Sequence, residues 1–73
     1  MADEIKLLDV VALLQDIPEE GLRRGEVGTV VEELAHGVYL VEFIDDLGQT
    51  QALPTVDASL LLPLLYPAQS SSS

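Results

Sequence analysis

The clearest pattern along the chain is a strict alternation of side chains from Val38 to Ile44. Successive side chains of a strand point to opposite faces, so one face takes Tyr39, Val41 and Phe43. We therefore predict a strand that turns these three side chains toward a core. The preceding run, residues 27–34, is rich in β-branched residues and predicts its antiparallel partner, because such side chains fit a pleated, half-buried surface.

Glycines divide this pattern into strands and turns. Gly25 suits a turn with positive φ, and Gly28, at the start of the strand, suits a close backbone approach or a bend. Gly37 follows His36 at a position that fits a primed hairpin turn, and Gly48 closes a second turn. Glycine-punctuated strands joined by tight hairpins are typical of small five-stranded barrels. We expect structural roles for these four glycines.

Residues 5–14 allow two interpretations, a short amphipathic helix or a buried strand over 10–14. The strand is favoured because Val10 and Val11 are β-branched and because Pro18 soon interrupts the segment. Residues 16–25 are predicted to form a long loop in which Leu22 faces inward.

The last third of the chain predicts two more strands. Residues 49–53 form a short strand that ends at Pro54, residues 55–59 a single helical turn, and residues 60–65 the last strand. Pro63 lies inside that last run and indicates an edge position or a bulge.

We therefore expect an all-β, five-stranded barrel with one short helical turn before its last strand. The barrel is predicted to span residues 1–66 as a single domain, followed by a flexible serine-rich tail, 67–73.

Charge and composition limit the function. The chain of 73 residues carries 13 acidic and 3 basic residues, for a formal net charge of −10 at pH 7. This balance argues against nucleic-acid and anionic-membrane partners. The hydrophobic fraction of 48% is enough for a core. Cysteine is absent, and neither a secretory leader nor a membrane-spanning run is evident, so we expect a cytoplasmic protein.

Few residues suggest chemistry. His36 is the sole histidine and is expected in a hairpin tip, where catalysis or metal binding would need convergent partners. Asp45, Asp46 and Asp57 do not follow the spacing of a calcium loop. We therefore predict no enzyme activity, no cofactor and no metal site.

Two features suit a protein partner. Arg23 and Arg24 form the only basic pair, which could bind a carboxylate on a partner or pair locally with nearby glutamates. The run 60–65 has more leucines than one face of a terminal strand can bury, which indicates a homo-oligomer contact or a docking edge. The candidate partner-binding residues are Arg23, Arg24, Leu61, Leu62, Leu64 and Tyr66.

These residues carry a resemblance to a family of very short bacterial proteins known only as a domain of unknown function (family 4926). The similarity covers about residues 5 to 65 and transfers no active site. More distantly, Gly25-x-x-Gly28-Thr29-Val30-Val31 is similar to KOW modules and other Src-homology-3-like barrels, which implies a small barrel. The matching segments are 7–14, Asp16, Pro18, Gly21-Leu22, Gly25, 27–32, 41–43, Asp45, Gly48 and Leu60-Leu61.

The interpretation that follows is a non-catalytic protein–protein interaction module with a Src-homology-3-like, KOW-like barrel. The alternative is an acidic inhibitor, or antitoxin-like protein, that neutralises a basic partner.

Charge also predicts a negative result with nucleic acid. At physiological salt we expect no binding to duplex DNA or RNA, because affinity for phosphates depends on lysines and arginines that displace counterions. Fluorescence anisotropy with labelled duplex and single-stranded probes measures this directly. Saturable micromolar binding would contradict the prediction and would favour a KOW-like function.

Overall fold

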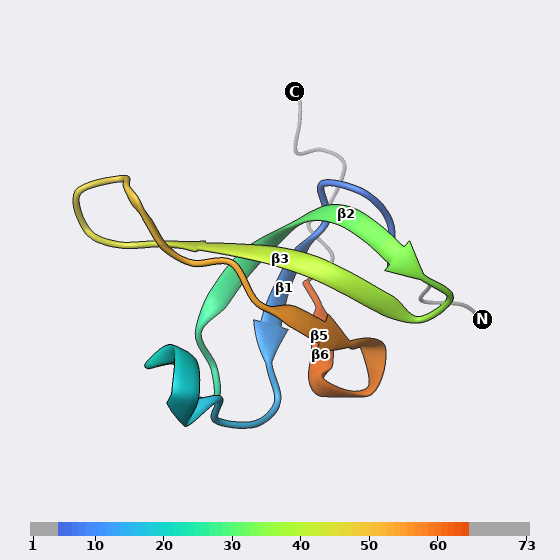
Figure 1. The fold of residues 1–73 in the computed structure, drawn as a ribbon, viewed down its shortest axis with the longest axis horizontal. Coiled ribbons are helices and arrows are strands. Elements are labelled where there is room, and N and C mark those ends of the chain that lie inside the picture. Colours follow the sequence, from blue (N-terminus) through green and yellow to red (C-terminus); the bar gives the residue numbers. More distant parts are fainter. Residues whose placement is uncertain (1–4, 65–73) are drawn as a thin grey trace.

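The computed structural model describes residues 5–64, which form an antiparallel sheet of six short strands and no α-helix (Figure 1). This confirms the all-β prediction, with one strand more than the sequence suggests. Short 3-10 turns occupy the loop after the first strand and the segment before the last. The elements are β1 (Val10–Leu13), η1 (Pro18–Glu20), β2 (Val27–Ala35), β3 (Val38–Ile44), β4 (Thr50–Ala52), β5 (Thr55–Asp57), η2 (Ala58–Leu60) and β6 (Leu61–Pro63).

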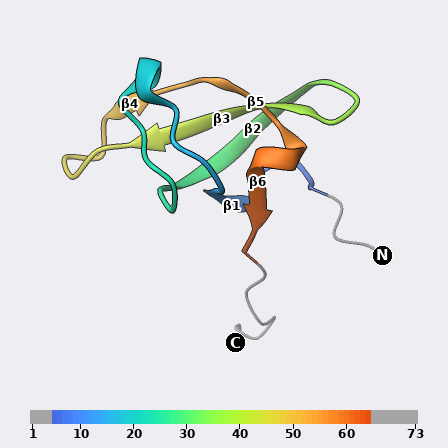
Figure 2. The ribbon, with the colours of Figure 1, turned by 90° about the horizontal axis from the view of Figure 1, so that it is seen from below.

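The β2–β3 hairpin is the centre of the sheet. The strand order is β4-β3-β2-β1-β6, and β5 pairs with the other half of β3. Figure 2 shows β6 beside β1 at the opposite end of the sheet from β4. Register shifts follow Val30 and Glu33 in β2, and such bulges increase the local twist. Of the two turn residues only Gly37 has a positive φ, 78°, so the primed turn expected at His36–Gly37 is not formed.

The extra strand arises at Pro54. The sequence predicts a helical turn over 55–59, but β5 occupies 55–57 and the 3-10 turn begins only at Ala58. The Val41 N–H donates to the Pro54 carbonyl at 3.0 Å, so β3 stays bonded to the chain on both sides of the proline. Proline has no N–H to donate, which divides one bent strand into β4 and β5.

One cluster of apolar side chains forms the core. The strand interpretation of residues 10–14 is confirmed, because β1 buries Val11 and Leu13 within the sheet. The inward face predicted for β3 is also confirmed, and Leu22 is 1% exposed, as predicted for the long loop. The buried residues are Ile5, Val11, Leu13, Leu22, Val30, Tyr39, Val41, Phe43, Ala52, Val56 and Leu61.

β6 lies at the end of the strand order, with its outer edge depleted of hydrogen-bond donors. Leu62 pairs with Ala12, so the backbone groups of Leu61 and Pro63 point to the free edge. The Leu61 N–H is bonded to the Ala58 carbonyl within η2, and Pro63 has no N–H. A strand approaching this edge would therefore find no free donor along β6. The edge position indicated by Pro63 agrees with this arrangement.

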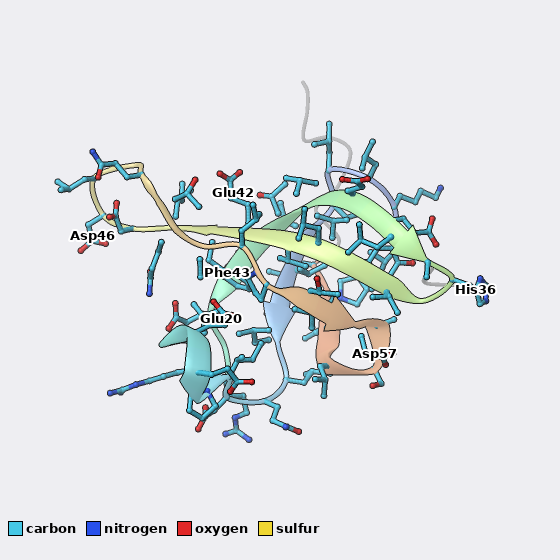
Figure 3. All side chains as sticks on the ribbon, viewed as in Figure 1. Glu20, His36, Glu42, Phe43, Asp46 and Asp57 are labelled. Atoms are coloured by element: carbon cyan, nitrogen blue, oxygen red, sulfur yellow. The ribbon has the colours of Figure 1, made fainter. Side chains whose placement is uncertain are left out.

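Gly28 permits a close contact between β2 and β3. A Cβ atom at this position would lie 2.8 Å from the Glu42 carbonyl oxygen and 2.8 Å from Cε2 of Phe43. Figure 3 shows Phe43 pointing into the middle of the molecule, where its ring is 1% exposed. The glycine is therefore needed for space, since its φ is not in the positive range.

Gly28→Val should destabilise the protein by about 3 kcal/mol or more, because a branched side chain must displace both the Phe43 ring and a backbone carbonyl. Thr29→Val is the control. It places the same side chain one residue later, on the half-buried opposite face, and should change stability by less than about 0.5 kcal/mol. Urea denaturation followed by circular dichroism measures both, and equal effects would contradict the contact assigned to Gly28.

Candidate functional site

The outward face of β2, β1 and β6 carries a row of apolar side chains. Ala12 pairs with Val27 on one side and with Leu62 on the other. Residues directly opposite across antiparallel strands have side chains on the same face, so the three lie side by side. Val27 is 51% exposed and Leu62 is 48% exposed. This row is the centre of what we call the outer apolar face.

Neighbouring positions extend the outer apolar face along both strands. Leu14 follows Ala12 by two residues and is 46% exposed. The Leu64 N–H donates to the Val10 carbonyl at 2.9 Å, which sets these two half-buried residues beside each other. The outer apolar face therefore comprises Val10, Ala12, Leu14, Val27, Leu62 and Leu64.

The candidate residues of the last strand separate between two faces. Leu61 is 4% exposed and packs in the core, so it does not belong to the outer apolar face. Its side chain faces inward because it pairs with the buried Leu13, whereas Leu62 faces outward. Tyr66 lies outside the described residues.

The arginine pair lies next to this face. Leu14, Arg23 and Arg24 line one open hollow of about 560 Å³, together with Gln15 and Asp16. Both arginines are exposed.

Local ion pairs, one of the two alternatives for these arginines, do not form among residues 5–64. The nearby carboxylates instead accept backbone N–H groups, Asp16 from Arg24 at 2.7 Å and Glu26 from Arg23 at 3.1 Å. Both guanidinium groups therefore remain available to a carboxylate on another molecule.

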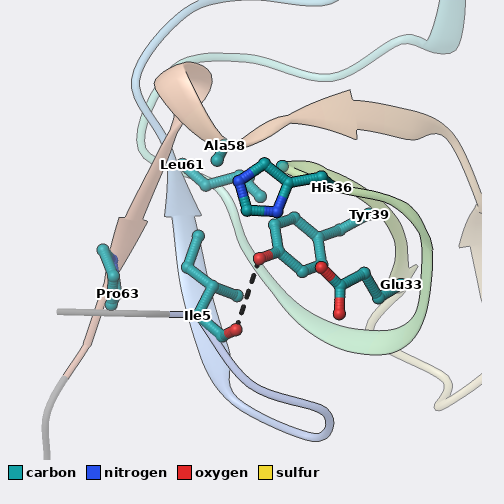
Figure 4. A pocket seen from close by; sticks show the side chains of 8 residues that line it. Ile5, Glu33, His36, Tyr39, Ala58, Leu61 and Pro63 are labelled. Carbon is teal, nitrogen blue, oxygen red and sulfur yellow. Dashed lines mark hydrogen bonds between the residues drawn. The ribbon is translucent and has the colours of Figure 1, made fainter.

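A separate groove opens on the inward side of the sheet, at the tip of the β2–β3 hairpin (Figure 4). Its volume is about 430 Å³. The Tyr39 hydroxyl donates to the Ile5 carbonyl at 3.3 Å and ties the start of the described chain across one side. The lining residues are Ile5, Glu33, His36, Gly37, Tyr39, Ala58, Leu61 and Pro63.

Glu33 occupies an unusual place in this groove. It pairs with Tyr39, which in turn pairs with Val56, and both of these are buried. The register therefore sets an exposed carboxylate at the end of a row that is otherwise part of the core. In Figure 4, Glu33 and His36 lie on the same side of the groove as Tyr39.

Most other ionisable groups have structural partners or lie apart. Figure 3 shows His36 and Asp46 at opposite ends of the molecule. Among the described residues no group of three histidine or acidic side chains is placed to hold a metal ion. Asp9, Asp16, Glu26, Asp45 and Asp57 each accept a backbone N–H, and Glu42 accepts the Thr50 hydroxyl. Glu19, Glu20, Glu32, Glu33 and Asp46 accept no hydrogen bond within residues 5–64.

Two of the structural glycines lie in turns with positive φ. Gly25 and Gly48 have φ values of 93° and 80° in turns, where side chains are rarely accommodated.

Sequence reasoning missed two sets of residues. Val10, Ala12, Leu14 and Val27 join Leu62 only through the pairing of β1 with β2 and β6, although alternation around Val11 already sets them apart from the core. Glu33 is exposed, but its place in the groove could not be predicted, because the bulge that sets its register has no local signal in the sequence.

The comparisons with known proteins assign a family. Residues 7–63 match the family model described as Domain of unknown function (DUF4926), so the chain belongs to this family. Neither the curated proteins nor the solved structures include a match to this chain. None of the helical segments in residues 5–64 is long and apolar enough to cross a membrane.

Asp57 provides a test of the electrostatics beside the groove. The Ser59 hydroxyl donates to its carboxylate at 2.6 Å and the Ser59 N–H at 3.0 Å, and these hydrogen bonds lower the pKa of Asp57. A lowered pKa stabilises the folded state fully above the unfolded value of about 3.9, and this contribution is lost as pH falls through the lower folded value.

Ser59→Ala should therefore raise the pKa of Asp57, because it removes the hydroxyl that contributes most to the shift. Ser59→Thr keeps a hydroxyl and should leave the pKa lowered. Carbon-detected NMR titration of the Asp57 carboxyl measures both variants. An unchanged pKa in Ser59→Ala would show that the hydroxyl is not the cause.

Proposed function

We propose that this protein is a non-catalytic protein-interaction module whose outer apolar face binds protein. The Leu62–Ala12–Val27 row, with Leu62 and Val27 about half exposed, carries the proposal. Large apolar side chains gathered on one face are costly to expose and are typical of interaction sites. The cytoplasm is the proposed location.

The finer fold assignment is a Src-homology-3-like barrel with a KOW-like glycine strand. Two features support it. The last strand returns to pair with the first, and a 3-10 turn precedes it. With β4 and β5 counted as one strand bent at Pro54, the topology has the five strands expected for such a barrel.

The occupant that best fits the outer apolar face is a second copy of this chain. A partner surface must offer apolar side chains together with carboxylates for Arg23 and Arg24. A second copy offers both, because it carries the same outer apolar face and, in the hollow that Leu14 and the arginines line, the Asp16 carboxylate. A domain this small also gains much of its stability from association.

Leu62→Glu should abolish association while the protein stays folded, because a charge would enter an apolar contact. Leu53→Glu is the matched control, since Leu53 is also 48% exposed but lies between β4 and β5. Leu61→Glu should lower the free energy of unfolding by about 4 kcal/mol, because it buries an unpaired charge. Sedimentation equilibrium gives the mass, and circular dichroism gives the fold.

The expected result is a wild-type mass that rises with concentration, a monomeric Leu62→Glu and a Leu53→Glu that associates normally. A wild-type monomer at all concentrations would overturn the second copy as occupant. If Leu62→Glu and Leu53→Glu lose self-association equally, the outer apolar face is not the contact.

The second candidate is an acidic inhibitor, antitoxin-like, that neutralises a basic partner. Within residues 5–64, five carboxylates accept no hydrogen bond and serve neither as caps nor as acceptors in turns, which favours this candidate: Glu19, Glu20, Glu32, Glu33 and Asp46. The negative electrostatic potential of the protein would increase the rate of association with a basic surface. A gene for a basic nuclease or toxin beside this one would favour the inhibitor, and a solitary gene would favour the general module.

A further inference from the structure

The groove at the hairpin tip has an apolar lining and a carboxylate at its rim. Ile5, Ala58 and Leu61 supply apolar surface, and the Glu33 carboxylate lies at the rim. None of the lining residues is a lysine or arginine. With a volume of about 430 Å³, the groove falls within the range of about 300–1,000 Å³ typical of ligand sites.

The position of Glu33 has a competing structural explanation. β1 pairs with only the first residues of β2, so the second half of β2 has one edge outside these ladders. Charged side chains at such an edge discourage pairing with other strands. Glu32, the neighbouring residue, would serve that role equally well, but it does not line the groove. The two explanations therefore make different predictions for these two adjacent glutamates.

Shape and charge together specify the ligand. A carboxylate that accepts no hydrogen bond among residues 5–64 fits a cationic donor. An arginine side chain is the best match, because its guanidinium is planar, binds a carboxylate through two parallel hydrogen bonds and stacks on aromatic rings. His36 offers an exposed ring on the same side of the groove as Glu33, and the aliphatic part of an arginine would lie against Ile5 and Leu61.

We propose that this groove binds an arginine side chain presented by a partner protein, with Glu33 as its carboxylate ligand and His36 as its stacking surface. This inference deepens the second candidate function, since it names the residue type of the basic partner that the protein would recognise. It does not involve the outer apolar face, so the association experiment and the one below can fail independently.

The test is an NMR titration of the full-length, ¹⁵N-labelled protein with N-acetyl-arginine methylamide at constant ionic strength. The norleucine analogue serves as the uncharged control and the lysine analogue as the non-planar cation. We expect weak, saturable shifts at the amides of Glu33, His36, Gly37 and Ala58. The norleucine analogue should shift none of them, and the lysine analogue should bind several-fold more weakly.

Glu33→Gln should weaken binding of the arginine analogue about tenfold, because a charge-assisted pair is replaced by a neutral hydrogen bond. Glu32→Gln makes the same change in net charge one residue away and should retain wild-type affinity. Equal weakening by both variants would mean general attraction to an acidic surface and would overturn the site. Absence of saturable shifts, or equal binding of the lysine or norleucine analogue, would overturn the arginine assignment.

Discussion

The packing of Phe43 against the backbone of Gly28 is the contact on which the rest of this fold depends. It brings β2 and β3 close enough that the Glu42 carbonyl lies within 2.8 Å of where a Cβ would be. That approach closes the buried side of the hairpin, and the hairpin supports every other strand except β6 directly. Both proposed surfaces follow from it. The same hairpin presents Val27 on the outer apolar face and Glu33 in the groove.

Local pattern was sufficient to predict the elements whose alternation is unbroken. Side-chain periodicity predicts the inward face of β3 and the strand at residues 10–13. Pro18 and Gly25 interrupt regular structure and so delimit the loop that carries the buried Leu22. Residues 55–57 were mistaken for a helical turn because Pro54 reads locally as the end of a strand. The hydrogen bond from Val41 to Pro54 is a tertiary interaction, and it lets the strand continue.

The candidate sites were less predictable, because they depend on register. A leucine-rich terminal strand indicates that some leucines face outward, but the pairing with β1 decides that Leu62 does and Leu61 does not. The arginine pair was visible in the sequence. Its availability was not, since only the structure shows the nearby carboxylates engaged by backbone N–H groups. Glu33 enters the groove through a bulge, which shifts register without a characteristic residue.

The donor-poor edge of β6 has a consequence for the stoichiometry of any complex. A sheet whose last strand offers free N–H groups can recruit another strand, whose own far edge recruits the next, and growth then has no natural end. Here Pro63 and the bonded Leu61 N–H leave that edge without donors, which disfavours strand pairing at β6 and favours contacts through the outer apolar face. When two copies pack face to face, each buries its outer apolar face, and that face can no longer bind a third copy. Such contacts give closed oligomers of fixed size, so a chain with exposed leucines can associate without open-ended aggregation.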